Sequence, residues 1–354
     1  MRPQSRHSTL ILFLVIALLL CSALPLGAQA NASSSRDVRI QVFSLFHPEV
    51  MLVTPVPGRG LRFSPGEIHH HAVRVALMEG AITYDKRTAT NISVGNELGG
   101  DADFTLSIPG KIERRFHGRL EMKSSRSQLV AIVSMDIETA VASVVAAESA
   151  SDAPLEALKA QAVAARSYFA AGSGRHGKAI DFCDSTHCQL LRSPPSEDSL
   201  AQRAASETRG MVLAYNDQIF ASMYSASCGG RTHSLEQLGM RVRDYPYYPV
   251  ECAYCRRHPE PWVAHIGDDA GKNLAMQHTE QARLKLARSL GWGTVPGNSY
   301  TVHESGNEIV ISGSGHGHGL GLCQRGAADM ARNGSTFQQI LLYYYPNTTL
   351  QHLP

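Results

Sequence analysis

One carboxylate and one group of His and Cys residues, both within 136–189, are the parts of this sequence best suited to chemistry. Glu148 stands where an apolar helical run ends, and partial desolvation there would raise the pKa of its carboxyl. Such a carboxyl can donate a proton near neutral pH. The alternative is a solvated glutamate at a helix C-terminus. The helix dipole is unfavourable at that position, so another group should compensate for it.

The His and Cys group follows the helical part of this stretch and comprises His176, Cys183, His187 and Cys188. Thiolate and imidazole together suit zinc, and four protein ligands make a closed, structural site. The alternative is a Cys183–Cys188 disulfide in an oxidising compartment. His187 and Cys188 are adjacent, so both can bind one metal only if the backbone turns there.

A second set of cysteines is spread over the C-terminal half and comprises Cys228, Cys252, Cys255 and Cys323. A CxxC spacing also occurs in redox motifs, but no thioredoxin-like βαβ pattern surrounds this one. We therefore expect a structural role. The sequence leaves open whether that role is a second, all-cysteine zinc site or two disulfides.

Residues 315–324, GHGHGLGLCQ, form a glycine-rich segment with an imidazole and an amide. Its glycines allow a close approach of backbone to backbone or to a ligand. The segment is not a dinucleotide fingerprint, because no acidic residue follows at the required distance in a βαβ unit. Hydrogen bonding to a sugar fits these side chains, and a tight structural turn is the alternative. Ser225 and Ser227 lie near His residues, but a GxSxG elbow is missing, which argues against a hydrolase triad.

Two helices joined by a short polar link must position Glu148. Apolar residues recur at helical spacing after Asp136, which is a plausible N-cap. Pro154 suits the first turn of the second helix, and Gly172 and Gly174 end it. The alanines of this second helix permit close packing against a neighbour.

Further elements follow from pattern and turn residues. We expect a hairpin that turns at Asn216-Asp217, an irregular loop rich in Tyr and Pro, and a strand at 308–313. Helices are expected at 197–208, 280–290, 326–333 and 337–344.

Residues 38 to about 130 contain short alternating runs separated by Pro and Gly, which predicts a mostly β region. The run His69-His70-His71 suggests a metal site. Neighbouring residues of a strand point to opposite faces, however, so at most two of the three could converge. We favour a surface strand.

Composition predicts a globular chain, and the N-terminus predicts export. Hydrophobic residues make up 43% and charged residues 18% of its 354 residues. Lys plus Arg number 33 and Asp plus Glu 31, and this near balance argues against nucleic acid as a partner. Arg2 and Arg6, the apolar run 10–20 and Ala28-Gln29-Ala30 predict a signal peptide cleaved after Ala30, with an uncleaved anchor as the alternative. We expect a periplasmic or cell-wall location.

Four segments together resemble the SpoIID/LytB family of peptidoglycan-active proteins. These are VVAAESASDAPLEALKAQAVAARSYF, DFCDSTHCQ, YSASCGGRT, and GHGLGLCQRGAADMARNG followed by YYYPNT. The resemblance spans about 130 to 350. Together with the N-terminal signals and the alternating β pattern, it predicts an α+β fold with a signal peptide at 1–30, a β-rich region at 31–130 and a SpoIID-like catalytic domain of mixed α/β structure at 131–354.

The resemblance implies a lytic transglycosylase that acts on peptidoglycan glycan strands, chiefly those stripped of stem peptides. Glu148 matches the family's catalytic glutamate, His318 and Gln324 match its C-terminal motif, and Ser227 lies in its groove-lining serine segment. The zinc-site segment of the family matches His176, Cys183, His187 and Cys188. One departure is His316, where the family often has an aromatic residue.

A single carboxylate fits this chemistry. Hydrolases of glycosides usually need two carboxylates, whereas a lytic transglycosylase uses no external water. Two other functions are alternatives: a non-catalytic glycan-binding module that enhances a cell-wall amidase, and a zinc hydrolase of stem peptides. The hydrolase would need an open metal position, which four protein ligands do not leave.

Overall fold

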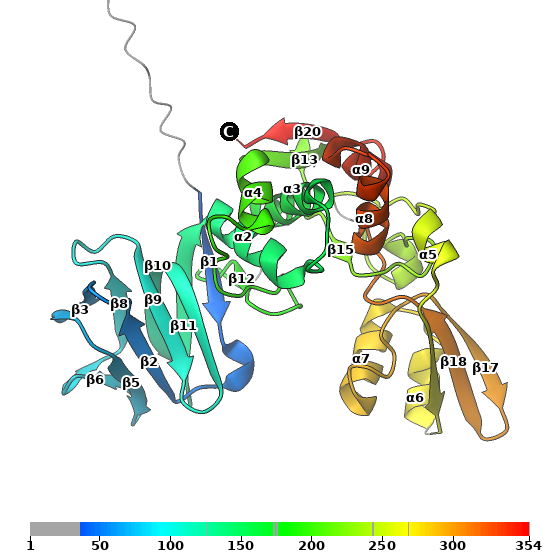
Figure 1. Cartoon of the computed structure of the whole chain (residues 1–354). Coiled ribbons are helices and arrows are strands. Elements are labelled where there is room, and N and C mark those ends of the chain that lie inside the picture. The colour runs from blue at the N-terminus through cyan, green and yellow to red at the C-terminus, as the bar shows by residue number, and fades with distance from the viewer. Residues whose placement is uncertain are drawn as a thin grey trace, which may run out of the picture. The chain divides into compact units, whose positions relative to one another are not determined.

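The computed structural model describes residues 36–353, apart from 126, 173, 175, 243 and 268. The expected signal peptide at 1–30 therefore lies outside the described residues. Strands dominate the first part of the described chain, and helices mix with short strands in the rest (Figure 1). This confirms the predicted α+β class. Within the described residues, no helix is both long and apolar enough to cross a membrane.

The β-rich part forms one 12-stranded sheet with the path β12-β1-β11-β10-β9-β2-β5-β6-β7, to which β3, β4 and β8 attach. Side chains alternate between buried and exposed along β1 and β2, as expected for strands with one face on a core. The strands are β1 Asp37–Val42, β2 Val50–Pro55, β3 Leu61–Ser64, β4 Ile68–His69, β5 Val73–Met78, β6 Ala81–Tyr84, β7 Arg87–Ala89, β8 Asn91–Gly95, β9 Ala102–Ile108, β10 Ile112–Ser125, β11 Gln128–Asp136 and β12 Phe182–Cys183; a short 3-10 helix, η1, spans Ser44–Phe46.

Strand β10 changes partner midway. Its first half pairs with β9 up to Gly118, and its second half pairs with β11 from Arg119 onward. Gly118 has φ +144°, and a Cβ there would overlap the backbone oxygen of Ser134. Glycine is therefore needed at the position where this strand crosses from one partner to the other.

Three helices follow the sheet: α2 Ile137–Glu148, α3 Leu155–Ala171 and α4 Leu200–Glu207. Glu148 is the last residue of α2, as the sequence predicts. Pro154, which the sequence predicts in the first turn of α3, lies one residue earlier, at the N-cap. Asp136 holds the N-cap position of α2, but its side chain makes no capping hydrogen bond. Helix α4 begins at Leu200 rather than at residue 197, and the side chain of Ser199 caps it.

Helix α3 is buried on nearly every side. It contacts α2 and α4 on one flank and β13, α8 and α9 on the other (Figure 1). Leu158, Ala162 and Phe169 belong to the core shared with the large sheet, whereas Ala160 and Val163 belong to the core of the C-terminal helices. Alanine lets neighbouring elements approach closely, and this one helix therefore joins two hydrophobic cores.

A buried arginine ties these elements together. Arg166 of α3 is fully buried and donates two hydrogen bonds, of 2.9 and 2.6 Å, to the carboxylate of Glu138 in α2. It also donates to the backbone oxygens of Ala205, 3.1 Å away, and Met211, 3.0 Å away. The paired charge and its satisfied donors link α2, α3, α4 and the next strand.

The C-terminal part combines short strands with helices around α3. The expected turn at Asn216-Asp217 has φ +49° and +60°, as a tight hairpin requires, and joins two strands. These elements are β13 Met211–Tyr215, β14 Gln218–Ile219, β15 Tyr224–Ser225, η2 Glu236–Leu238, α5 Ala253–Arg257, β19 Leu322–Cys323, α8 Gln324–Arg332, α9 Phe337–Tyr344 and β20 Thr349–His352.

Between α5 and β19 the chain inserts a small sheet with two helices and its own apolar core, which includes Ile266, Leu286 and Ile311. The three strands pair in the order β16-β18-β17. The elements are β16 Pro261–Ile266, α6 Asp269–Ala275, α7 Glu280–Leu290, β17 Tyr300–Ser305 and β18 Glu308–Ser314.

The three-histidine run does not form a surface strand, which corrects our expectation. Only His69 lies in a strand, and it is 6% exposed, with its ring against Phe63 and Nε2 3.8 Å from Asp85. His70 and His71 are exposed. One histidine of the run is therefore part of the core, and the other two lie on the surface.

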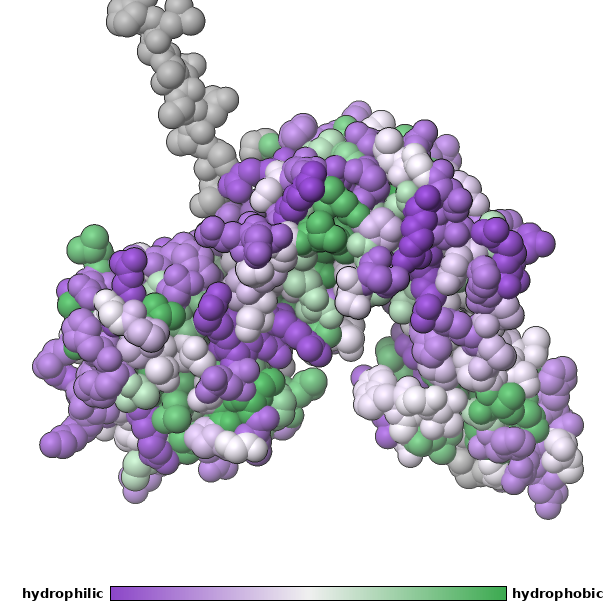
Figure 2. Space-filling view, viewed as in Figure 1, coloured by the Kyte–Doolittle hydropathy of each residue, from purple (hydrophilic) through white to green (hydrophobic). Residues whose placement is uncertain are grey.

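Figure 2 shows one face of the molecule, on which hydrophilic residues surround small, separate groups of apolar residues. Isolated apolar side chains on a surface are ordinary in folded proteins. This face therefore does not present one continuous apolar surface.

We predict that Arg166→Ala lowers the free energy of unfolding by about 3–5 kcal/mol, because the Glu138 carboxylate stays largely buried after losing its charged partner. Guanidinium denaturation measures this change. The matched control is Arg87→Ala, whose guanidinium meets Glu67 at 2.9 Å on the surface; its loss should cost less than about 1 kcal/mol. Equal effects of the two substitutions would contradict the anchoring role of Arg166.

Candidate functional site

Glu148 lies at the C-terminal end of α2 and is partly buried. Its Oε1 accepts a hydrogen bond from the backbone N–H of Leu190, and the phenol of Tyr224 also lies at the carboxyl. Burial raises the pKa of Glu148, and these two hydrogen bonds oppose that shift. They are also the compensation that a carboxylate at a helix C-terminus requires.

A small group of polar side chains surrounds this carboxyl. The Tyr224 hydroxyl has one proton, for which Oε1 of Gln189 at 2.9 Å and the Glu148 carboxyl are alternative acceptors. Nε2 of Gln189 donates to the Ala165 oxygen at 3.2 Å. Burial and the neighbouring Glu148 hold the pKa of Tyr224 well above its usual range. The phenol therefore keeps its proton and remains a hydrogen-bond donor.

Sequence reasoning missed Tyr224, Gln189 and Gln161 as members of this site. Gln161 is buried in α3 and accepts from the Ser149 hydroxyl at 2.8 Å. A polar residue that interrupts the alanine-rich face of α3 was an available signal for Gln161. Gln189 ends the His and Cys stretch, but nothing in its spacing indicated contact with Tyr224.

Gln324 meets Glu148 through the main chain. Its Nε2 donates to the backbone oxygen of Glu148 at 3.0 Å, although 176 positions separate the two residues. The last carbonyls of a helix lack hydrogen-bond donors within the helix, and Gln324 supplies a donor to one of these carbonyls. The structure thus brings the N-terminus of α8 to the C-terminus of α2.

His318 lies beside Tyr224 rather than beside Glu148 itself. Its Nδ1 accepts from the Leu320 N–H at 2.9 Å, and the ring also hydrogen-bonds to the backbone of Tyr224. Burial lowers the pKa of His318 to about 4, an effect that nearby Glu280 opposes. The imidazole is therefore neutral at pH 7, and it contacts the residue that holds the Glu148 carboxyl.

Ser227 is placed differently from these residues. Its hydroxyl is buried, and Oγ lies 3.5 Å from Sγ of Cys255. Its backbone N–H and oxygen pair with His316, at 3.2 and 2.9 Å. Ser227 thus contacts the second cysteine set through its hydroxyl and the glycine-rich segment through its backbone.

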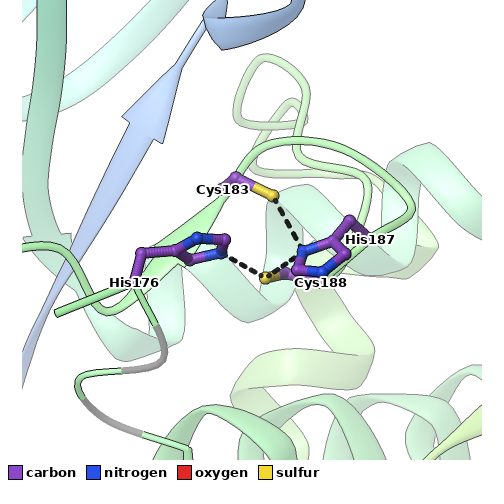
Figure 3. A group of neighbouring side chains, drawn as sticks. All are labelled: His176, Cys183, His187 and Cys188. Carbon is purple, nitrogen blue, oxygen red and sulfur yellow. Dashed lines mark hydrogen bonds between the residues drawn. The ribbon is translucent and has the colours of Figure 1, made fainter.

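The first candidate metal centre contains all four predicted residues (Figure 3). Their ligand atoms lie within 4.8 Å of one another, with Nε2 of His176 3.2 Å from Sγ of Cys188 and Nδ1 of His187 3.8 Å from Sγ of Cys183. Hydrogen bonding by Cys188 holds the pKa of the Cys183 thiol well below its usual range. Two thiols and two imidazoles at this spacing fit a tetrahedral metal ion.

The large sheet holds the loop that carries this centre. Cys183 lies in β12, which pairs in parallel with β1. The next residue, Asp184, accepts from the Phe43 N–H at 3.1 Å and from Arg114 at 2.8 Å. Since Leu190 follows in the same loop, the metal centre and the Glu148 hydrogen bond depend on one anchored segment.

The second cysteine set converges as well. Sγ atoms of Cys228, Cys252, Cys255 and Cys323 lie within 4.8 Å of one another, and all four residues are buried. The spacing could hold a metal ion.

Two cavities of the described residues lie away from Glu148. One of about 500 Å³ is lined by residues that include Arg231, His233 and Tyr300, and another of about 500 Å³ by residues that include Arg74 and Lys111. Glu148 lines neither.

One protein-family model matches part of the chain. Residues 125–215 match the model of SpoIID, described as stage II sporulation protein. This match covers α2, α3, Glu148 and the first metal centre.

Three relatives match a larger part of the chain. An uncharacterised protein of Brachyspira hyodysenteriae is 28% identical over 263 residues, which cover 65% of this chain and 70% of that protein. The stage II sporulation protein D of Bacillus subtilis is 24% identical over 269 residues, 62% of this chain and 75% of that protein. The amidase enhancer of Bacillus subtilis is 24% identical over 273 residues, 55% of this chain but only 38% of the enhancer.

We predict that Tyr224→Phe raises the pKa of Glu148 further, because it removes a donor that stabilises the carboxylate. The carboxyl then keeps its proton to a higher pH. A ¹³C NMR titration of the glutamate carboxyls measures the change, with Glu148→Gln assigning the signal. Tyr248→Phe, at an exposed phenol that contacts Tyr215, is the control and should leave this pKa unchanged. A lower or unaltered pKa in Tyr224→Phe would contradict the proposed contact.

Proposed function

We propose, on the premise that this chain belongs to the SpoIID family, that it is a peptidoglycan lytic transglycosylase with Glu148 as its single general acid and base. Its substrates are glycan strands, chiefly those without stem peptides, and the bond cleaved joins N-acetylmuramic acid to N-acetylglucosamine. The observation that carries this proposal is a partly buried carboxyl at the end of α2 that an amide and a phenol hold, where burial raises its pKa.

The reaction needs two proton transfers. Protonated Glu148 first gives its proton to the glycosidic oxygen, which leaves with N-acetylglucosamine as a hydroxyl. The Glu148 carboxylate then takes the proton of the muramic 6-hydroxyl, while that oxygen bonds to C1 and closes a 1,6-anhydro ring. The carboxyl ends in its starting state, and no water is consumed.

The surroundings of Glu148 support a one-carboxylate mechanism. The groups that perturb its pKa are an amide and a phenol. Hydrolysis of a glycoside ordinarily uses a second carboxylate as base or nucleophile. Burial raises the pKa of Glu148 and so increases its protonated fraction, which favours the proton transfer of the first step.

Other residues position the acid in this proposal. Gln324 caps the end of α2, and neutral His318 holds the backbone of Tyr224. The YSAS and glycine-rich segments would form a wall of the glycan groove. Ser227 would shape that wall through its backbone, because its hydroxyl is directed to Cys255.

We also propose that the protein is exported and loses its signal peptide after Ala30. His176, Cys183, His187 and Cys188 would hold a structural zinc ion that stabilises the loop carrying Leu190. With four protein ligands the ion has no open position, so it would have no direct part in the chemistry.

A second candidate function is enhancement of a cell-wall amidase, which the similarity to the Bacillus subtilis amidase enhancer favours. In that case the chain binds glycan strands without cleaving them and stimulates an added amidase. Product analysis distinguishes the two functions.

We predict that Glu148→Gln reduces the formation of 1,6-anhydro products by about 10²–10⁴-fold or more, because the amide cannot donate the required proton. Mass spectrometry of products from purified, peptide-free glycan strands measures this loss. The amide oxygen can still accept from Leu190, so the fold should be retained.

The matched control is Glu197→Gln, which makes the same chemical change at an exposed position and should leave activity unchanged. Circular dichroism verifies the folding of both variants. Full activity in folded Glu148→Gln would exclude Glu148 as the acid. Reducing ends in place of anhydro ends would show a hydrolase.

For the first metal centre, we predict that Cys183→Ser combined with Cys188→Ser removes one equivalent of bound zinc. Elemental analysis of protein purified without chelator measures it. A Cys183–Cys188 disulfide in the metal-free wild type, found by mass spectrometry, would contradict the zinc assignment.

A further inference from the structure

We infer that Cys228, Cys252, Cys255 and Cys323 form a second structural metal centre, a tetrathiolate site for Zn²⁺, which fixes the N-terminus of α8 and with it Gln324. The metal assignment does not depend on the proposed transglycosylase activity. It rests on the geometry of the four sulfurs and on the groups directed at them.

The four sulfurs converge as one tetrahedral ion requires. All lie within 4.8 Å of one another, and those of Cys255 and Cys323 are 3.5 Å apart. A zinc–sulfur distance of about 2.3 Å places the sulfurs of a tetrahedral site about 3.8 Å apart. Two disulfides would instead bring the sulfurs together in two pairs, each bonded at about 2.0 Å. Disulfide bonding would not require the two pairs to lie next to each other.

Burial strengthens this assignment. The four cysteines are between 0 and 2% exposed. They belong to the same apolar core as Leu322 and Tyr344. Thiols are weak hydrogen-bond donors and acceptors, so hydrogen bonds among the four cysteines do not explain why they converge in this core. One metal ion bound by all four sulfurs does explain it.

Three further groups are directed at the sulfurs. The Gly326 N–H donates to Sγ of Cys323 at 3.5 Å. The hydroxyl of Tyr344 lies 3.4 Å from Cys252, and that of Ser227 lies 3.5 Å from Cys255. Donors around the thiolates of a metal site stabilise their charge and orient them. This arrangement also explains why the Ser227 hydroxyl is directed inward.

Gly326 shows how tightly the centre is packed. A Cβ at this position would come within 2.6 Å of Sγ of Cys252 and would overlap the Tyr344 hydroxyl. Only glycine allows the first turn of α8 to approach the sulfurs so closely.

The centre joins three separate segments of the chain. Cys228 follows β15, Cys252 and Cys255 lie at the N-terminus of α5, and Cys323 is the N-cap of α8. Gln324, the residue after Cys323, donates to the Glu148 backbone. Metal binding would therefore hold the segment that caps the helix of Glu148.

The test uses the full chain after removal of its signal peptide, purified without chelator. Wild type should contain two equivalents of zinc, and the double variant Cys183→Ser/Cys188→Ser should retain one. That variant, reloaded with Co²⁺, should show intense thiolate-to-cobalt charge transfer and the visible bands of a tetrahedral site with four sulfurs. Cys252→Ser/Cys255→Ser should lose these features and one equivalent of zinc.

Native alkylation of wild type keeps the test decisive if Cys252→Ser/Cys255→Ser fails to fold. Iodoacetamide should modify the four cysteines only after a strong zinc chelator is added. Modification before chelation would overturn the assignment. Zinc-free Cys183→Ser/Cys188→Ser would overturn it as well, and so would an intact mass showing that these four cysteines had lost four hydrogens to disulfides.

Discussion

Burial of α3 on both flanks is the constraint on which the rest of the structure depends. One flank belongs to the core of the large sheet and the other to the core of the C-terminal helices. Small side chains are needed so that both sets of neighbours can approach, and α3 is accordingly rich in alanine. Arg166 is a large, charged residue of this helix, and its buried charge is matched by Glu138 and by the backbone oxygens of Ala205 in α4 and Met211 in β13.

The candidate active site is built from the ends of elements that this packing brings together. Glu148 ends α2, Gln324 begins α8, and Leu190 lies in the loop anchored at β12. Helix ends carry unpaired backbone groups, which makes them suitable places to fix a carboxyl and a capping amide. Each proposed metal centre adjoins a segment that contacts Glu148, through Cys188 before Leu190 and through Cys323 before Gln324.

Local patterns predicted local structure well. The expected boundaries of α7 and α9 match the structure, and so do the end of α2 at Glu148 and the hairpin turn at Asn216-Asp217. Errors arose where a tertiary contact decides. His69, for example, is buried with its ring packed on Phe63. Asp136 does occupy the expected N-cap position, although its side chain forms no capping bond. Strand β20 pairs with β13 across more than a hundred positions, which no local period indicates.

The sequence by itself determined where a partly desolvated carboxylate ends a helix and which His and Cys residues lie close enough along the chain to bind one ion. Both are consequences of short-range spacing. Only the tertiary structure decided that Tyr224 and Leu190 hold Glu148, that Gln324 caps its helix, and that Cys228 and Cys323 meet at one point. These contacts join segments that are distant in sequence and that meet where two cores are buried against α3.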